Sequence, residues 1–132
     1  MIFLFMSGDK KKILLVEDDK ILSQALSDGL KEAGFSVAQA FDGEEGLTKA
    51  FAAKPDLILL DIMMPKMDGL TVAKKLKSDP STRNIPTIIL TMLETGEPLA
   101  EAIQTGVYEY LVKSDFEIED IVAKVKERLG VA

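Results

Sequence analysis

The sequence contains no cysteine and no histidine. The absence of cysteine excludes disulfides, thiol nucleophiles and thiolate metal ligands. The absence of histidine removes the commonest general base and transition-metal ligand, so any bound metal must be a hard cation held by oxygen atoms. Arginine is scarce, since only Arg83 and Arg128 are present, and the net charge is −6. This charge balance argues against direct nucleic-acid binding.

Long hydrophobic runs are also missing. The apolar residues 1–6 are too few for a membrane span and lack the charged start of a signal peptide, so we predict a cytoplasmic protein without membrane contact. The length of 132 residues, with 47% hydrophobic and 29% charged, is typical of one globular domain. We expect a flexible leader over residues 1–11, the folded domain over 12–129 and a short tail over 130–132. An edge or dimer contact made by the leader is the alternative.

Short apolar segments alternate with helical patterns along the chain. Strands are predicted over residues 13–16, 35–40, 56–61, 87–91 and 108–113, each followed by a helix. This alternation predicts an α/β fold, in which a parallel sheet carries helices on both faces. The first and third strands are the most apolar and are therefore placed at the centre. We predict a five-stranded parallel sheet of order 2-1-3-4-5, the flavodoxin-like three-layer (βα)5 sandwich.

Local signals define the helix ends. Asp42 and Asp68 are predicted N-caps, and Gly34 is expected to end the first helix. For the last helix we predict a capping box formed by Ser114 and Glu117. A short helix is predicted over residues 98–105. The apolar stripe predicted for the first helix contains Ile21, Leu22, Ala25, Leu26 and Leu30, and the solvated face of the third contains Lys74, Lys75 and Lys77.

Polar side chains follow four of the predicted strands, at the edge where parallel strands end together. They are Glu17, Asp18 and Asp19 after the first strand, Asp61 after the third, Thr91 after the fourth and Lys113 after the fifth. Clustered carboxylates repel one another unless a cation lies among them, and a few carboxylates with backbone oxygen and water suit Mg²⁺. Acidic strand ends can alternatively serve only as helix caps, which is the interpretation we favour for Asp19.

Asp61 is the predicted nucleophile, because a carboxylate that attacks phosphorus forms an acyl phosphate. Phosphoryl transfer needs positioning and charge neutralisation more than proton chemistry. The Lys113 ammonium can reach one phosphoryl oxygen, and the Thr91 hydroxyl can donate to another. Considered alone, Lys113 could be an ordinary edge-strand lysine, and Thr91 could be present for its β-propensity. Because both accompany Asp61, we assign them to the site.

Four motifs occur in one order and spacing. They are Leu-Val-Glu-Asp-Asp at 15–19, Leu-Asp-Ile-Met-Met-Pro-Lys-Met-Asp-Gly at 60–69, Ile-Leu-Thr at 89–91 and Tyr-Leu-Val-Lys at 110–113. Together they make the chain similar to a response-regulator receiver domain, the phospho-accepting half of a two-component system. The resemblance covers nearly the whole chain, roughly residues 12–129.

The resemblance assigns roles to the site residues. It implies that Asp61 is the phosphorylation site and, with Asp18, a direct Mg²⁺ ligand, that Glu17 acts through water, and that the Met63 backbone carbonyl completes the protein ligands. Thr91 and Lys113 would sense the phosphoryl group. Tyr110 would be the aromatic switch whose ring turns inward when Thr91 moves.

The resemblance also implies partners. A histidine kinase or histidine phosphotransfer protein would supply the phosphoryl group, with small acyl phosphates as substitutes. The last two strands, with the helices over residues 98–105 and 117–129, would then present a changed face to a downstream protein. The chain would be a monomer or a phosphorylation-dependent dimer, and its only chemistry would be its own phosphorylation and dephosphorylation.

Two departures from the family pattern affect the site. Receivers usually have proline after the lysine, whereas this chain has Ser114, so we predict either a trans bond with a shifted loop or a strained cis bond. Met92 follows Thr91 where a small residue is usual. Together with Met63 and Leu93, it adds apolar bulk, from which we predict slow hydrolysis of the phosphorylated form.

Two other functions use similar residues. An aspartate-nucleophile phosphatase of the haloacid-dehalogenase type needs a second acid two residues after the nucleophile, where this chain has Met63, and it needs room for a substrate cap. A receiver-like interaction module that is never phosphorylated is the other alternative. The retained Asp18, Asp61, Thr91 and Lys113 argue against it.

Overall fold

The computed structural model describes residues 10–62, 64, 67–91, 109–112 and 117–131, with the backbone alone for Thr91 and for residues 109–112. Five parallel strands form one sheet in the order β2-β1-β3-β4-β5, as predicted. The strands are β1 (Lys12–Val16), β2 (Ser36–Ala40), β3 (Leu57–Asp61), β4 (Thr87–Thr91) and β5 (Glu109–Val112). The described helices are α1 (Lys20–Glu32), α2 (Gly43–Ala53), α3 (Gly69–Ser78) and α5 (Ile118–Leu129). The helix predicted over residues 98–105 lies outside the described residues.

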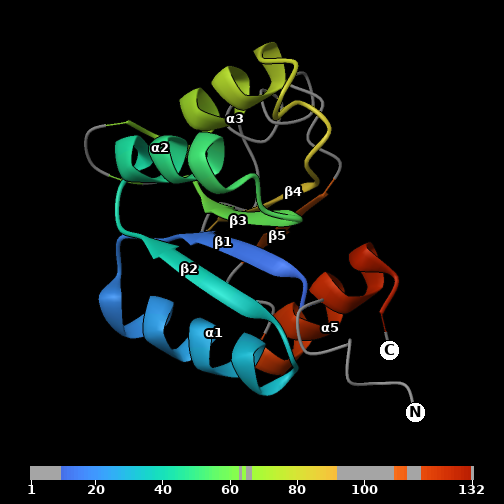
Figure 1. The fold of residues 1–132 in the computed structure, drawn as a ribbon. Helices are drawn as coiled ribbons and strands as arrows, with labels where there is room; N and C mark the ends of the chain where they lie inside the picture. Colours follow the sequence, from blue (N-terminus) through green and yellow to red (C-terminus); the bar gives the residue numbers. More distant parts are fainter. Residues whose placement is uncertain (1–9, 63, 65–66, 92–108, 113–116, 132) are drawn as a thin grey trace.

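The helices cover both faces of the sheet and make three layers. Helices α2 and α3 lie on one face, and α1 and α5 lie on the other (Figure 1). All five residues of β3 are buried, because successive side chains of a strand point to opposite faces and both faces are covered. Accordingly, Leu57 and Leu59 belong to the apolar cluster under α1 and α5, whereas Ile58 and Leu60 belong to the cluster under α2 and α3. Within the described residues, no helix is both long and apolar enough to span a membrane.

The helix ends confirm most of the local predictions. The Asp42 carboxylate accepts from the Glu45 N–H at 2.8 Å, and Asp68 accepts from the Thr71 N–H at 2.9 Å. Gly34 follows α1 with φ at 100°, a left-handed conformation that glycine adopts without strain. The N–H groups of Gly34 and Phe35 donate to the carbonyls of Lys31 and Leu30, which is the Schellman arrangement.

Three local predictions need correction. Ile21 is 85% exposed and does not join the buried stripe because, at 3.6 residues per turn, it lies on the side of α1 opposite the buried Ser23 and Leu30. The cap of α5 lies one turn later than predicted: the helix starts at Ile118, and the Asp120 carboxylate accepts from the Glu117 N–H at 3.0 Å. Lys77 is half-buried and donates to the Arg83 carbonyl at 3.0 Å, so burial lowers the pKa of its ammonium, with a smaller contribution from the nearby Arg128 charge.

Two buried serines of α1 offer a matched stability test. Ser23 and Ser27 are both 0% exposed, but only the Ser23 hydroxyl accepts a bond, from Gln39 Nε2 at 2.9 Å, while the Ser27 hydroxyl has no partner in the described structure. We expect Ser27→Ala to raise the free energy of unfolding by about 1 kcal/mol, because it removes a desolvated hydroxyl and favours the helix. Ser23→Ala should lower it by about 1 kcal/mol, because the Gln39 amide loses its partner. Urea denaturation measures both, and a destabilised Ser27→Ala would contradict the assignment.

Candidate functional site

The strand register brings the predicted acids to one edge of the sheet. Val16, the last residue of β1, is opposite Leu60 of β3, and Asp61 is opposite Leu90 of β4. Glu17 therefore leaves β1 beside the place where Asp61 ends β3. This is the carboxyl edge of the sheet, where open α/β folds bind ligands.

Three carboxylates meet there. Glu17, Asp18 and Asp61 each offer one oxygen, and these oxygens all lie within 4.8 Å of one another. Glu17 is 1% exposed and Asp61 is 3% exposed, whereas Asp18 is exposed to solvent. The structure thus brings together three of the predicted site residues, from two separate strands.

The backbone around Glu17 orients its carboxylate. The Glu17 N–H donates to the Ala40 carbonyl of β2 at 3.0 Å. The Glu17 carboxylate turns back toward the chain and accepts from the Asp19 N–H at 3.1 Å. The Asp19 carboxylate instead caps α1, where it accepts from the N–H groups of Ile21 and Leu22 at 3.0 and 3.1 Å. Asp19 is therefore a helix cap, as predicted, and not a member of the acidic cluster.

Gly69, whose role the sequence analysis missed, lies against the backbone of Asp61. Its N–H donates to the Ile62 carbonyl at 2.9 Å. A Cβ atom at Gly69 would lie 2.1 Å from the Asp61 carbonyl oxygen, a distance that backbone atoms cannot accommodate. The only sequence signal was the position of this glycine directly after the Asp68 cap.

The other predicted site residues are described in part or not at all. Thr91 ends β4, and Tyr110 is opposite Ile89 in β5, so the backbone positions of both residues are known. Met63, Met92, Leu93, Lys113 and Ser114 lie outside the described residues, and the predictions on the Lys113–Ser114 bond stay predictions.

The donor set fits a hard divalent cation. Three like charges within 4.8 Å, two of them on buried residues, are unfavourable unless a cation offsets them. Carboxylate oxygens are the ligands that Mg²⁺ prefers, and the exposed Asp18 leaves one side open to the water that Mg²⁺ retains. The acidic cluster can therefore hold such an ion.

The fold and the cluster define the class of protein: a flavodoxin-like α/β domain with a candidate hard-cation site at the carboxyl edge of its sheet. The chain belongs to the response regulator receiver domain family, whose family model matches residues 13–126.

Individual relatives agree with this assignment. The DNA-binding dual master transcriptional regulator RpaA of Synechocystis is 39% identical over 118 residues, which are 89% of this chain and 48% of RpaA. The response regulator PleD of Caulobacter vibrioides is 37% identical over 117 residues, which are 89% of this chain and 25% of PleD. The chain thus spans half or less of these curated relatives.

Solved structures show the same fold. The receiver domain of Francisella response regulator 1452 has a TM-score of 0.82 and 32% identity, and the alignment covers 92% of this chain and 98% of that one. The chemotaxis protein CheY4 of Vibrio cholerae has a TM-score of 0.83 and 31% identity, with 89% and 98% covered. The chain is a receiver domain of two-component phosphorelay signalling, a class that interacts with histidine kinases and downstream effectors.

Proposed function

We propose that Asp61 accepts a phosphoryl group from the phosphohistidine of a histidine kinase or histidine phosphotransfer protein. The observation that carries this proposal is the meeting of Glu17, Asp18 and Asp61 at the carboxyl edge of the sheet. Asp61 is the member of this cluster that ends the central strand β3. The family match over residues 13–126 supports, within this proposal, a receiver domain over residues 12–129 flanked by segments 1–11 and 130–132.

The proposed reaction is a displacement at phosphorus. A carboxylate oxygen of Asp61 forms the new P–O bond, the P–N bond to the donor histidine breaks, and the product is an acyl phosphate. Asp18, Asp61 and the Met63 carbonyl would hold Mg²⁺, with Glu17 acting through water. The cation would offset the negative charge that the phosphoryl group adds. The chain's chemistry ends with gain and loss of this one group.

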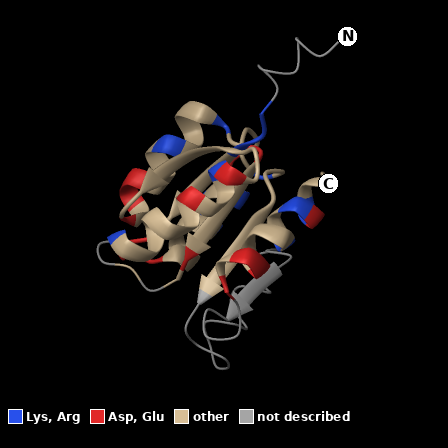
Figure 2. Ribbon diagram, turned by 90° about the horizontal axis from the view of Figure 1, so that it is seen from below, with Lys and Arg blue, Asp and Glu red and all other residues tan. Residues whose placement is uncertain are grey.

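The proposed output is a change of surface. The Thr91 hydroxyl and the Lys113 ammonium would bind the phosphoryl oxygens, and Tyr110 would then turn inward. The face formed by β4, residues 98–105, β5 and α5 would shift its population toward a form that binds a downstream protein or a second copy. In Figure 2 acidic and basic residues are interspersed on the helices, in keeping with a protein partner rather than a nucleic acid.

Intact-mass measurement tests the proposal. After incubation with Mg²⁺ and acetyl phosphate, the chain should gain the mass of one phosphoryl group, and omission of Mg²⁺ should suppress the gain. Peptide mapping should place the group on Asp61. Repeated release of phosphate from small esters would instead indicate a phosphatase, which no observation in the structure favours.

The apolar side chains of Met63 and Leu93 are predicted to prolong the lifetime of phosphorylated Asp61, and this can be tested. We expect Met63→Asn combined with Leu93→Glu to speed the loss of phosphate from Asp61 by about 10-fold, because polar groups at these positions admit and orient the attacking water. The decay of the phosphorylated mass after removal of acetyl phosphate measures this rate. Met63→Leu, which retains apolar bulk, is the control and should leave the rate unchanged. Equal decay rates in all three proteins would refute this role of the bulk.

A further inference from the structure

Gln39 of the edge strand β2 and Phe41, just after this strand, connect α1 to α2 around the side of the sheet. The Gln39 side chain donates to Ser23 of α1 at 2.9 Å, while the Gln39 carbonyl accepts from Lys49 of α2 at 2.6 Å. The Phe41 ring, just after β2, lies under the Lys20 ammonium of α1, 5.5 Å from nitrogen to ring centroid. We call this set of contacts the β2 brace; it consists of Lys20, Ser23, Gln39, Phe41, Glu45 and Lys49.

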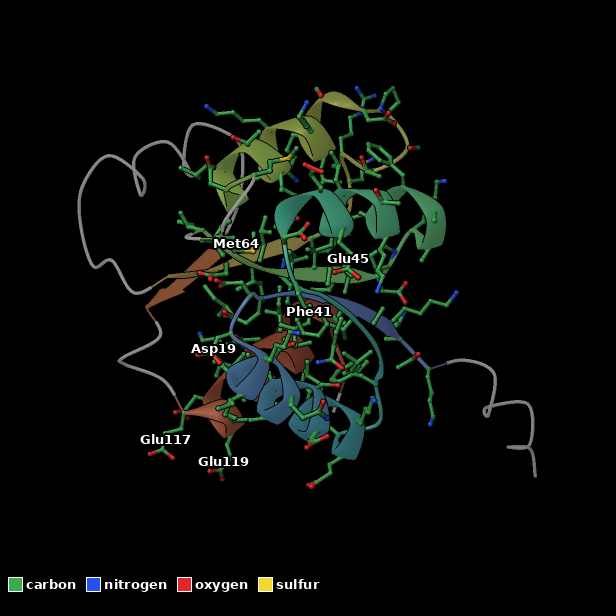
Figure 3. The ribbon with its side chains drawn as sticks, turned by 90° about the vertical axis from the view of Figure 1, so that its left-hand side faces the viewer. Asp19, Phe41, Glu45, Met64, Glu117 and Glu119 are labelled. Atoms are coloured by element: carbon green, nitrogen blue, oxygen red, sulfur yellow. The ribbon has the colours of Figure 1, made fainter. Side chains whose placement is uncertain are left out.

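Helix α2 fixes the backbone of Phe41. The Phe41 N–H donates to Glu45 Oε1 at 2.8 Å, and this bond is the main reason why the pKa of Glu45 is lowered. Glu45 is itself held, since its N–H donates to Asp42 and its carboxylate lies 3.2 Å from the Lys49 ammonium. Figure 3 shows Phe41 between the start of α1, where Asp19 is labelled, and α2, where Glu45 is labelled. The aromatic ring is therefore carried by backbone that a hydrogen bond to Glu45 holds in place.

The brace is attached to both ends of the acidic segment 17–19. The carbonyl of Ala40, which lies between Gln39 and Phe41, accepts from the Glu17 N–H at 3.0 Å. At the other end, Lys20 directly follows Asp19, whose N–H holds the Glu17 carboxylate at 3.1 Å. A shift of Lys20 would therefore move the backbone that orients Glu17 and carries Asp18.

We infer that Lys20 and Phe41 are positioning residues for the metal site: their cation–π contact holds residues 17–19 in the shape that brings Glu17 and Asp18 to Asp61. This inference rests on the proposed function, because it takes the acidic cluster as the Mg²⁺ site. Both residues would act through the backbone of residues 17–19.

Removal of the Lys20 side chain should change Mg²⁺ affinity in opposite directions under the two explanations, electrostatic repulsion and positioning. Lys20 is a cation two residues from Asp18, so removing its charge would strengthen Mg²⁺ binding if only Coulomb repulsion mattered. If Lys20 positions the segment, removing it must weaken Mg²⁺ binding instead. Phe41 carries no charge, and its replacement tests positioning without any change in net charge.

The experiment is a titration of the full chain with Mg²⁺ alone, followed by calorimetry or by backbone amide NMR shifts. Lys20→Met and Phe41→Leu should each raise the Kd by about 3-fold, which is within what one exposed cation–π contact can contribute. Lys20→Arg and Phe41→Tyr retain a cation over an aromatic ring and should restore the wild-type Kd. The double variant Lys20→Met/Phe41→Leu should bind Mg²⁺ as tightly as either single variant, because each single substitution already removes the same contact. Lys31→Met, at the exposed far end of α1, is the charge-loss control.

Melting temperatures by circular dichroism separate positioning from unfolding. Lys20 is exposed, so Lys20→Met should keep the wild-type melting temperature and remain informative even where Phe41→Leu loses stability. A Kd that stays the same or falls in Lys20→Met overturns the inference while leaving the proposed function intact. Failure of the wild-type chain to bind Mg²⁺ at all would instead remove the proposed metal site, and this inference with it.

Discussion

Replacing Asp61 by asparagine should abolish the phosphorylated form completely. The amide has nearly the same shape as the carboxylate, but it lacks the anionic oxygen that forms the bond to phosphorus. The substitution also removes one of three negative charges that lie within 4.8 Å of one another, so the folded protein should be at least as stable as the wild type in the absence of Mg²⁺. Intact mass after incubation with acetyl phosphate and Mg²⁺ measures the first effect, and urea denaturation measures the second.

The matched control for this substitution is Asp28→Asn. Asp28 is an exposed carboxylate of α1 whose hydrogen bond is to the Gln24 side chain at 2.8 Å, remote from the acidic cluster. This variant should be phosphorylated like the wild type. A phosphoryl group that still appears on the Asp61→Asn protein, at Asp18 or elsewhere, would show that the acceptor has been assigned to the wrong carboxylate.

Replacing Gly69 by alanine should damage both the fold and the site. The added Cβ would lie 2.1 Å from the Asp61 carbonyl oxygen and 2.8 Å from Ile62 Cα, and neither backbone atom can turn away as a side chain would. We expect a loss of about 3 kcal/mol in the free energy of unfolding, the upper part of the range for overpacking. For a chain of this size, that loss lowers the melting temperature by about 10 °C. Because the clash displaces the backbone of Asp61 itself, phosphorylation of the folded fraction should also be slower.

Gly29→Ala is the control for this second prediction. Its added Cβ would meet Ile118 Cγ2 at 2.9 Å, the end of a side chain that can move, and alanine favours the interior of α1 by about 1 kcal/mol. These effects oppose each other, so we expect stability close to that of the wild type. A Gly69→Ala protein as stable and as rapidly phosphorylated as Gly29→Ala would mean that α3 can move away from β3 at no cost.

The strand order could be predicted because a strand that is buried on both faces has a continuous apolar sequence. The segments 13–16 and 57–60 are continuous apolar runs, and the structure places them in β1 and β3, two of the three interior strands of the sheet. The caps Asp42 and Asp68 were likewise predictable, since a capping bond joins residues three apart. The clustering of Glu17, Asp18 and Asp61 followed from the parallel topology, which aligns the ends of the strands.

Other features depend on contacts that no local pattern records. Ile21 was placed in the core because it is apolar, but the buried face of α1 includes two serines, Ser23 and Ser27, and Ile21 lies on the opposite side. The contact between Lys20 and Phe41 joins residues 21 positions apart, and nothing near either residue in the sequence predicts it. The closeness of Gly69 to Asp61 was missed for the same reason, since it arises from how α3 packs against the end of β3.

The bond between Lys49 and Gln39 also limits how copies of this chain can associate. The Ser36 N–H and the Ala40 C=O form hydrogen bonds on the side of β1. Successive residues of a strand direct their N–H and C=O groups to opposite sides, so those of Gln39 face the outer edge of the sheet. A strand from another molecule that paired along β2 would have to displace the Lys49 ammonium from the Gln39 carbonyl. A lysine placed in this way blocks strand addition, and so it protects the protein against edge-to-edge aggregation on this side.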